Sequence, residues 1–234
     1  MSMRVLAWPY ANRRGNPYTH LLYDEMQTLG ATVEEFRPRR VLTRRYDVWH
    51  MHWPDGAFNR DAWGRAWIGS WGLRCLLRVA QLRGTRLVWT AHNIGGHETR
   101  HPRLEARAWR DLTRQLDAYI SLSRTAKAEL EREYPALRAC SSFVVPHGHY
   151  RGAYPDDVTR EEARSALGLP KGAPVLLYFG FIRPYKNVPE LVRAFRALES
   201  EAHLVVAGNP QTQELAEAVT AAAKEASHVH LALD

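Results

Sequence analysis

A glycine and two cations stand between a strand-like segment and a helix-like segment in the second half of the chain. Residues 175–179 form a short apolar run typical of a buried strand, and from Leu191 onward apolar residues recur at helical spacing. Gly180, Arg183 and Lys186 lie between these segments. A glycine turn lets the backbone approach a ligand, and the free N–H groups at a helix start favour an anion. Two fixed positive charges there suit a diphosphate, although an ordinary loop with solvated cations has the same local pattern.

Imidazoles follow two strand-like segments in the first half of the chain. His50 and His52 end the segment 47–52, and His92 directly follows the segment 86–91. In an open parallel sheet the functional loops lie at the carboxyl ends of the strands, so we expect these side chains at one edge. Other residues of these loops are Gly15, which follows the first strand, and Asn93, His97 and Glu98. A glycine, several imidazoles and a carboxylate at one edge predict a functional site.

The same histidines could instead bind a metal ion. A His50-x-His52 pair at a strand end is a plausible ligand pair, and His92, His97 and His101 could add to it. However, Trp53-Pro54 follows the pair directly, and no aspartate completes an evident ligand set. We therefore expect no bound metal, with a metal-dependent hydrolase as the alternative.

Five segments carry a resemblance to a known family. Gly180-x-x-Arg183-x-x-Lys186, followed by Pro-Glu-Leu-x-x-Ala-Phe, resembles the start of the nucleotide-sugar domain of retaining glycosyltransferase family 4, which has the GT-B fold. Asn187 stands where most members have glycine, a departure that leaves both charges in place. Four further segments match in the same order: Gly15-Asn-Pro-Tyr18, His50-Met-His-Trp53, Ala91-His-Asn93 with His97-Glu98, and Val145-Pro-His-Gly-His149.

The resemblance implies a role for each of these residues. Arg183 and Lys186, with Gly180, would grip the diphosphate of the donor, and Gly15 would lie near the donor phosphate. His92 would be the catalytic residue that contacts the donor sugar. The residues expected to face the acceptor or the cleft are His50, His52, Asn93, His97 and Glu98. Family members leave the anomeric configuration unchanged, and the leaving diphosphate helps to deprotonate the acceptor. The resemblance therefore implies positioning and charge stabilisation, with no protein nucleophile and no cofactor besides the nucleotide-sugar donor.

Strand-like and helix-like segments alternate along most of the chain. Over residues 1–150 this alternation predicts a parallel sheet covered on both faces, an acceptor-side Rossmann-like domain. Residues 151–172 are rich in proline, glycine and charge, which predicts a linker. The alternation resumes in residues 173–234, a partial nucleotide-sugar-binding domain with three expected strands. We therefore predict an α/β, GT-B-like fold with two lobes, a cleft between them, and an incomplete second lobe.

Three strands are too few for a complete doubly wound domain. We therefore expect a truncated enzyme, or one half of a split enzyme whose other half is a second polypeptide. By itself this chain is expected to show little or no transfer.

Composition narrows the class of protein. The 234 residues are 45% hydrophobic and 24% charged, as in ordinary soluble globular proteins. No apolar run approaches the about 20 residues of a membrane span, and the first residues contain too short an apolar core for a signal peptide. Only Cys75 and Cys140 are present, so no disulfide framework is implied and a cytoplasmic location is predicted.

Positive charge is concentrated in the first part of the chain. Residues 1–155 contain 24 Lys and Arg against 14 Asp and Glu, whereas residues 156–234 contain 8 and 11. This asymmetry fits an anionic partner such as a lipid surface, a phosphorylated acceptor or nucleic acid, and it equally fits a generally basic proteome. The aromatic residues follow no recognisable RNA-binding pattern, so we expect no nucleic acid partner.

Three tryptophans recur every four residues in the helix expected over residues 63–83. Arginines lie around Trp63, Trp67 and Trp71 at positions 65, 74, 78 and 83, as in a helix that lies at a membrane interface. The alternative is a buried helix face whose arginines extend to solvent, and this interpretation is favoured on sequence alone. The protein is accordingly expected in the cytoplasm, with possible contact to the inner face of the membrane.

The leading hypothesis is a glycosyltransferase that moves a hexose from a nucleoside-diphosphate sugar to a saccharide or lipid-linked acceptor, in bacterial polysaccharide or glycolipid synthesis. The first alternative is a sugar-nucleotide epimerase or hydrolase of similar two-domain shape. Such an enzyme needs acid–base carboxylates facing the donor, and Glu98 is the sole candidate. The second alternative is an inactive fragment, and a nucleic-acid-binding protein is less favoured.

Overall fold

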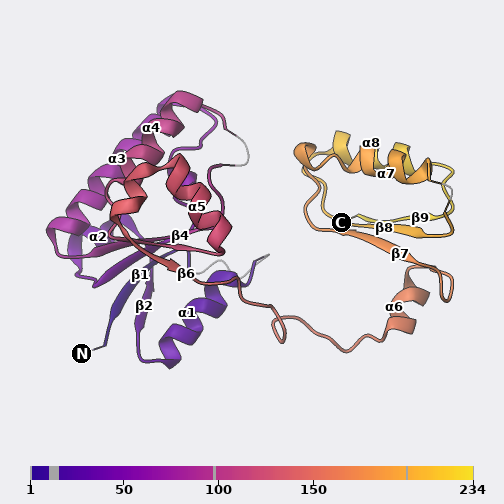
Figure 1. Cartoon of the computed structure of the whole chain (residues 1–234), viewed down its shortest axis with the longest axis horizontal. Coiled ribbons are helices and arrows are strands. Elements are labelled where there is room, and N and C mark those ends of the chain that lie inside the picture. Colours follow the sequence, from indigo (N-terminus) through magenta and orange to yellow (C-terminus); the bar gives the residue numbers. More distant parts are fainter. Residues whose placement is uncertain (1, 11–15, 97–98, 199, 234) are drawn as a thin grey trace. The chain divides into compact units, whose positions relative to one another are not determined.

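The computed structural model describes residues 2–10, 16–96, 99–198 and 200–233. The chain divides into two compact units, Met1–Tyr154 and Pro155–Asp234 (Figure 1). The boundary lies within the segment 151–172 that the sequence predicts as a linker. This segment also contains a short helix, α6 (Arg160–Ala166), which the sequence analysis missed. Thr159 and Glu162 form a reciprocal capping box that begins this helix.

The first unit contains a parallel sheet of six strands in the order β2-β1-β3-β4-β5-β6. The strands are β1 (Arg4–Trp8), β2 (Thr32–Glu35), β3 (Val48–Met51), β4 (Arg86–Ala91), β5 (Ala118–Ser121) and β6 (Ser141–Val144). The helices are α1 (Tyr18–Thr28), α2 (Pro38–Thr43), α3 (Trp63–Leu82), α4 (Pro102–Thr113) and α5 (Arg124–Glu133), with 3-10 turns η1 (Pro54–Ala57) and η2 (Pro135–Ala139). The predicted parallel α/β architecture is confirmed, although α2 and both 3-10 turns are too short to give a periodic signal.

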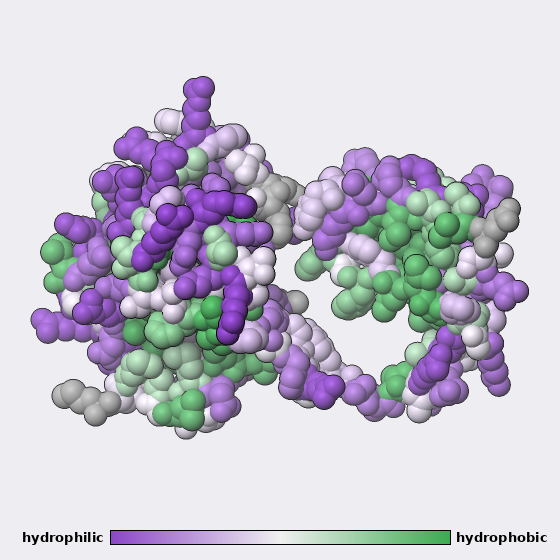
Figure 2. All heavy atoms as spheres, in the orientation of Figure 1, coloured by the Kyte–Doolittle hydropathy of each residue, from purple (hydrophilic) through white to green (hydrophobic). Residues whose placement is uncertain are grey.

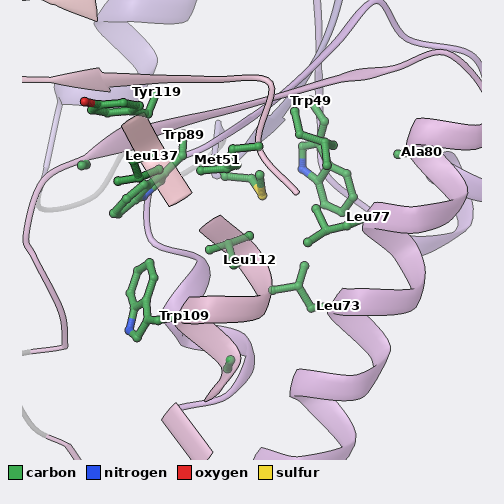
Figure 3. Packing of buried hydrophobic residues seen from close by; sticks show 14 of the residues in the cluster. Trp49, Met51, Leu73, Leu77, Ala80, Trp89, Trp109, Leu112, Tyr119 and Leu137 are labelled. Atoms are coloured by element: carbon green, nitrogen blue, oxygen red, sulfur yellow. The ribbon is translucent and has the colours of Figure 1, made fainter. Parts of the chain in front are cut away.

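The main core lies between the sheet and the helices α3, α4 and α5. Figure 3 shows Trp49 and Met51 of β3 packed toward Leu73 and Leu77 of α3, and these side chains belong to one buried cluster. Because successive side chains of a strand point to opposite faces, this packing directs His50 to the other face of the sheet.

Helix α1 covers that other face, on the side opposite α3, α4 and α5 (Figure 1). The sequence predicts an apolar face of Leu21, Leu22, Met26 and Leu29, but this is partly wrong. The side chains of Leu21 and Leu29 are exposed, and α1 buries Thr19 and Tyr23 instead. Because Tyr23 reaches polar groups on the sheet, the buried stripe of this helix is partly polar.

The face of the sheet that carries α1 is covered only in part. Among the described residues, α1 is the helix that packs there, and Phe143 of β6 remains 55% exposed. The expectation of a sheet covered on both faces therefore holds for the central strands and not for the β6 edge.

The three tryptophans of α3 are not buried. Trp63, Trp67 and Trp71 are exposed, and the helix packs on the sheet through Ala66, Leu73, Leu77 and Ala80. The interpretation favoured on sequence, a buried tryptophan face, is therefore wrong. A spacing of four residues marks one side of a helix without saying which side faces the core, and the alanines and leucines pack closer to the sheet.

The second unit contains a parallel sheet in the order β7-β8-β9. Its strands are β7 (Val175–Phe179), β8 (His203–Gly208) and β9 (Val229–Leu233), and its helices after α6 are α7 (Val188–Arg196) and α8 (Gln213–Ala223), with the turn η3 (Pro184–Lys186). The core is formed by side chains such as Val192 and Phe195 of α7 packed against Leu204 and Val206 of β8.

Strand β7 is exposed, contrary to the expectation of a buried strand. Leu177 and Phe179 are 64% and 81% exposed. Both α7 and α8 pack on one face of this sheet, and Figure 2 shows hydrophobic side chains over the strands on the side away from these helices. An apolar run predicts burial only where both faces of a parallel sheet are covered.

Candidate active site

A hydrogen-bonded chain of three side chains lies at the carboxyl edge of the first sheet. The Tyr23 hydroxyl of α1 and Nε2 of His52 are 2.8 Å apart. On the other side of the same ring, Nδ1 of His52 is 2.9 Å from Nε2 of His92. His52 follows β3 and His92 follows β4, which pair as neighbours, so the sheet register brings the two imidazoles together. The sequence-based expectation that these histidines meet at one edge agrees with this arrangement.

The site lies where the strand order reverses. β1 is flanked by β2 on one side and by β3 on the other, so the loops after β1 and β3 diverge at this point. Ligands of open parallel sheets bind at such switch points. The loop after β1 is the one that contains Gly15, which lies outside the described residues.

Burial separates His50 and His52 from His92. His50 and His52 are 5% and 1% exposed, whereas the His92 side chain is half-buried. Both buried imidazoles are bonded within the cluster: His50 Nε2 lies 2.8 Å from the Thr90 hydroxyl oxygen, and His52 holds His92. Their placement facing the acceptor or the cleft stays a prediction.

All three imidazoles favour the neutral form. Burial, and secondarily the neighbouring His92, lowers the pKa of His50 to about 4. Burial, with His50 and His92 nearby, lowers the pKa of His52 to about 2. Burial, with His147 nearby, lowers the pKa of His92 to about 4. A neutral imidazole carries one N–H and one acceptor nitrogen, so the direction of each hydrogen bond in the chain is coupled to the next.

The buried tyrosine fixes this direction. Burial raises the pKa of Tyr23 well above its usual value, so its hydroxyl keeps its proton. Among the described residues, His52 Nε2 is the acceptor within hydrogen-bond distance of that hydroxyl. If Tyr23 donates to Nε2 of His52, then His52 donates from Nδ1 to Nε2 of His92, and the His92 proton resides on Nδ1. The opposite direction would leave the buried hydroxyl proton without an acceptor among these residues, which is costly.

Aromatic rings hold His92 on its other sides. The Trp53 ring stacks on His92 with centroids 4.5 Å apart, and the Tyr18 ring meets it edge-on at 4.7 Å. The His147 ring lies 4.9 Å from Tyr18. In the sequence, His147 belongs to the segment Val145-Pro-His-Gly-His149, which carries the resemblance and was given no separate role. Packing from three directions restricts the imidazole of His92 to one orientation.

This cluster predicts a pH-dependent stability. The unfolded chain binds protons at these histidines near pH 6.5, whereas the folded protein resists protonation until about pH 4 for His50 and His92. The free energy of unfolding that each contributes is therefore complete above pH 6.5 and is lost as the pH falls toward 4. For His50 the change is on the order of 3 kcal/mol.

Urea unfolding of the wild type and of His50→Asn at about pH 7 and about pH 5 measures this effect. We expect a smaller loss of stability on acidification in the variant than in the wild type. His101→Asn, outside the cluster, is the control and should keep the wild-type pH dependence. An equal pH dependence in His50→Asn and the wild type would contradict the prediction.

The second cluster lies in the second unit, between β7 and α7. Gly180 follows β7 with a φ of +124°, a conformation that glycine adopts without strain. A Cβ built on Gly180 would lie 4.0 Å from Nζ of Lys186, so the ammonium group stands beside this turn. Arg183 is half-buried with its guanidinium 5.9 Å from the Phe181 ring, and Lys186 Nζ is 5.9 Å from the Tyr178 ring.

The departure at Asn187 has a structural explanation. Asn187 has a φ of +49° and a ψ of +41°, the left-handed region, immediately before α7. Glycine and asparagine are the residues that adopt this conformation most readily. The asparagine therefore keeps the backbone that a glycine would give at this position.

Gly208 is a residue that the sequence analysis missed. A Cβ at Gly208 would lie 1.9 Å from the Gly180 carbonyl oxygen, so a larger residue at the end of β8 would displace the turn after β7. Only the pairing of β7 with β8 brings these two glycines together.

The remaining predicted site residues are placed as follows. Asn93 is exposed beside His92. His97 and Glu98 lie outside the described residues, as does Gly15. The residues that the sequence analysis did not assign to the site are Tyr18, Tyr23, Trp53 and Thr90. Tyr18 and Trp53 belong to segments that carried the resemblance, so their position was a usable signal, whereas no local pattern marks Tyr23 or Thr90.

The histidines face one another as hydrogen-bond partners. The 2.9 Å between His52 Nδ1 and His92 Nε2 is a hydrogen-bond distance, and these two nitrogens are paired with each other. Over the residues that the structure describes, no group of three or more His, Cys, Asp or Glu side chains has an arrangement that could hold a metal ion.

Sequence comparison relates the chain to glycosyltransferases. Residues 159–233 match the family Glycosyl transferases group 1. Over 223 residues the chain is 32% identical to a GDP-mannose:glycolipid 4-beta-D-mannosyltransferase of Xanthomonas campestris pv. campestris. The aligned region covers 92% of this chain and 56% of the relative. A second sequence of that name matches to the same extent. The chain spans about half the length of the curated relatives it matches.

Solved structures share the fold at low sequence identity. Anabaena HepE, in complex with UDP and glucose, superposes with a TM-score of 0.65 at 15% identity, over 99% of this chain and 69% of HepE. A glycosyltransferase from Rickettsia africae gives 0.61 at 12% identity, over 100% and 68%. S. aureus MnaA with UDP gives 0.52 at 10% identity, over 99% and 68%. The chain therefore has a GT-B-like fold of two Rossmann-like parallel α/β units, and its residues 159–233 match the family of group 1 glycosyl transferases.

Proposed function

We propose that the chain belongs to a glycosyltransferase that moves a hexose from a nucleoside-diphosphate sugar to a lipid-linked or saccharide acceptor. The observation that carries this proposal is the 223-residue match to the Xanthomonas mannosyltransferases, which extends through both units. The relatives' name makes GDP-mannose the first donor to test and a glycolipid the first acceptor. No cofactor besides the donor is required.

In this proposal, Arg183 and Lys186 of the second unit bind the diphosphate of the donor. Arg183 and Lys186 both follow the glycine turn after β7: Arg183 directly precedes the η3 turn, Lys186 is the last residue of η3, and α7 begins at Val188. Charge-assisted hydrogen bonds from these side chains stabilise the negative charge that grows on the diphosphate as the bond to the sugar breaks.

In this proposal, the imidazole of His92 contacts the sugar of the donor. Its neutral ring, held by Trp53, Tyr18 and His52, presents a fixed dipole to the sugar without adding a charge. With a pKa of about 4, His92 is a weak base at neutral pH, so its role is to orient the ring and stabilise charge.

The transfer could proceed with either of two stereochemical outcomes at the anomeric carbon, retention or inversion. The motif resemblance favours retention, in which the leaving diphosphate accepts the proton of the acceptor. The name of the Xanthomonas relatives specifies a beta linkage, and an α-linked nucleotide sugar gives a β product only by inversion. Inversion requires a base that deprotonates the acceptor hydroxyl. The sequence nominates Glu98 for that role, and Glu98 lies outside the described residues. The anomeric configuration of the product, measured by NMR, decides between them.

A transfer assay tests the function. Labelled GDP-mannose or UDP-glucose is incubated with the protein and a glycolipid extract, and the label entering the lipid phase is measured. The proposal predicts label in the lipid phase that depends on the acceptor, measured as the difference between samples with and without it, even where the level of transfer is low. Conversion or hydrolysis of the donor without an acceptor would favour the epimerase or hydrolase alternative. This alternative is compatible with the fold, because a Listeria monocytogenes structure described as a putative UDP-N-acetylglucosamine 2-epimerase also superposes with a TM-score of 0.51.

One expectation from the sequence remains a proposal. The enzyme is proposed to act in the cytoplasm, at the inner face of the membrane where a lipid-linked acceptor would be presented. None of the described helices is both long and apolar enough to cross a bilayer.

A further inference from the structure

The outward side of α3 is apolar and aromatic. Trp63, Trp67 and Trp71 are 60%, 49% and 60% exposed, and Ile68 between them is 62% exposed. On a helix that advances about 100° per residue, these four side chains fall within less than half a turn, opposite the leucines that pack on the sheet. Exposed aromatic groups of this size are unusual on a soluble surface and mark an interaction site.

The same helix is entirely cationic in its charge. The 20 residues of α3 include Arg65, Arg74 and Arg78 and contain no aspartate or glutamate. Arg74 is paired with Asp111 of α4 at 3.2 Å. No carboxylate of the described residues lies within ion-pair distance of Arg65 or Arg78, and both are exposed. The surface is thus complementary to an apolar partner that carries negative charge.

A hollow continues this surface beside Ile68. A cavity of about 480 Å³ opens next to α3, and its walls include Ile68 and Leu76 of α3, Phe36, and Trp8 at the end of β1. Arg60, Asp61 and Arg65 also line the cavity, and the Asp61 carboxylate is paired with Arg100. Apolar walls beside Arg60 and Arg65 suit the boundary between lipid headgroups and acyl chains.

The tryptophans of α3 lie near the carboxyl edge of the first sheet, the same edge that carries the candidate site. α3 begins after the η1 turn, which directly follows His52 and Trp53 at the carboxyl edge of the sheet. The three tryptophans occupy the first half of the helix, the half nearest that edge. A surface that rests here would present its headgroups near His92.

We propose that the exposed side of α3, defined by Trp63, Trp67, Ile68 and Trp71 with Arg65 and Arg78, docks on the surface of a bilayer that contains anionic lipids. The indole rings insert at the headgroup level, where an amphipathic ring is most stable. The arginines attract the anionic headgroups. This attachment is peripheral and does not depend on the transferase assignment.

Vesicle co-sedimentation with the 234-residue chain tests the proposal. The probes are phosphatidylcholine vesicles with and without phosphatidylglycerol. We expect binding to the anionic vesicles that weakens at high salt, and a blue shift of tryptophan emission on binding. Replacement of all three tryptophans (Trp63→Ser, Trp67→Ser, Trp71→Ser) should weaken partitioning by about tenfold or more. Arg65→Glu with Arg78→Glu should weaken it by about fivefold or more per position.

Matched substitutions elsewhere serve as controls. Leu29→Ser with Leu198→Ser removes exposed apolar side chains from other surfaces, and Arg124→Glu with Arg132→Glu reverses two exposed charges on α5. Both control variants should partition like the wild type, and circular dichroism confirms that every variant is folded. If a folded triple tryptophan variant keeps its affinity, or the wild type does not bind anionic vesicles, the proposal is overturned. Self-association in solution that the triple variant abolishes, without vesicle binding, would assign this surface to a second copy of the chain.

Discussion

His92→Ala is expected to lower the rate of sugar transfer by roughly a hundredfold or more, with a small effect on donor affinity. The imidazole follows a rigid strand, it is held by Trp53 and His52, and its pKa of about 4 keeps it neutral. Removing a contact that forms mainly in the transition state lowers kcat and leaves the affinity for the donor nearly unchanged. Initial rates in a preparation with demonstrated transfer activity, together with calorimetric donor binding, measure both effects.

The control for this prediction is His101→Ala, which removes an imidazole that bonds to the Arg60 carbonyl outside the cluster. It should leave turnover near the wild-type level. Tyr23→Phe removes the hydroxyl that sets the proton position on His92, and a smaller loss in turnover is expected from it. Near-normal turnover in a folded His92→Ala variant would refute the role of His92.

Removing both cations beside Gly180 is expected to weaken nucleoside-diphosphate binding by about a hundredfold, and removing either one by about tenfold or more. Arg183 and Lys186 lie on the turn between β7 and α7, where backbone N–H groups add to the positive potential. Each single variant to alanine, and the double variant, are compared by calorimetry with GDP and UDP.

Arg193→Ala is the matched control, because Arg193 is an arginine of α7 that is paired with Glu190. Its affinity for nucleotide should equal that of the wild type. Unchanged affinity in the Arg183→Ala and Lys186→Ala variants, where the wild type binds, would remove the assignment of the donor site.

Local patterns sufficed for the geometry of a turn, which depends on its own segment. The turn after β7 was predicted from its glycine and two cations, and the structure places the Lys186 ammonium beside Gly180. Even the unusual Asn187 is explained locally, since its left-handed backbone is one that asparagine tolerates. The strands β3, β4 and β7 were likewise predicted to within about one residue, because short apolar runs between polar turns are distinctive.

Burial could not be predicted from the same patterns. The tryptophans of α3 and the residues of β7 have the composition of core segments, and both are exposed. Which side of a helix faces the sheet, and whether a second layer covers a strand, depends on elements that are distant in the sequence. For that reason the favoured interpretation of α3 was wrong, and the interfacial alternative became the basis of the membrane proposal.

The sequence by itself determined the parallel α/β class, the order of the elements, and the identity of the histidines and cations that belong to candidate sites. Only the tertiary structure decided how those histidines are buried and hydrogen-bonded. His50 is buried and bonded to Thr90, and His52 is buried and bonded to Tyr23 and His92. Strand pairing and the packing of α1 bring these residues together although they are 29 to 40 positions apart. Hydrogen-bond direction and pKa depend on the partners and solvent around a group, and these exist only once distant segments are packed together.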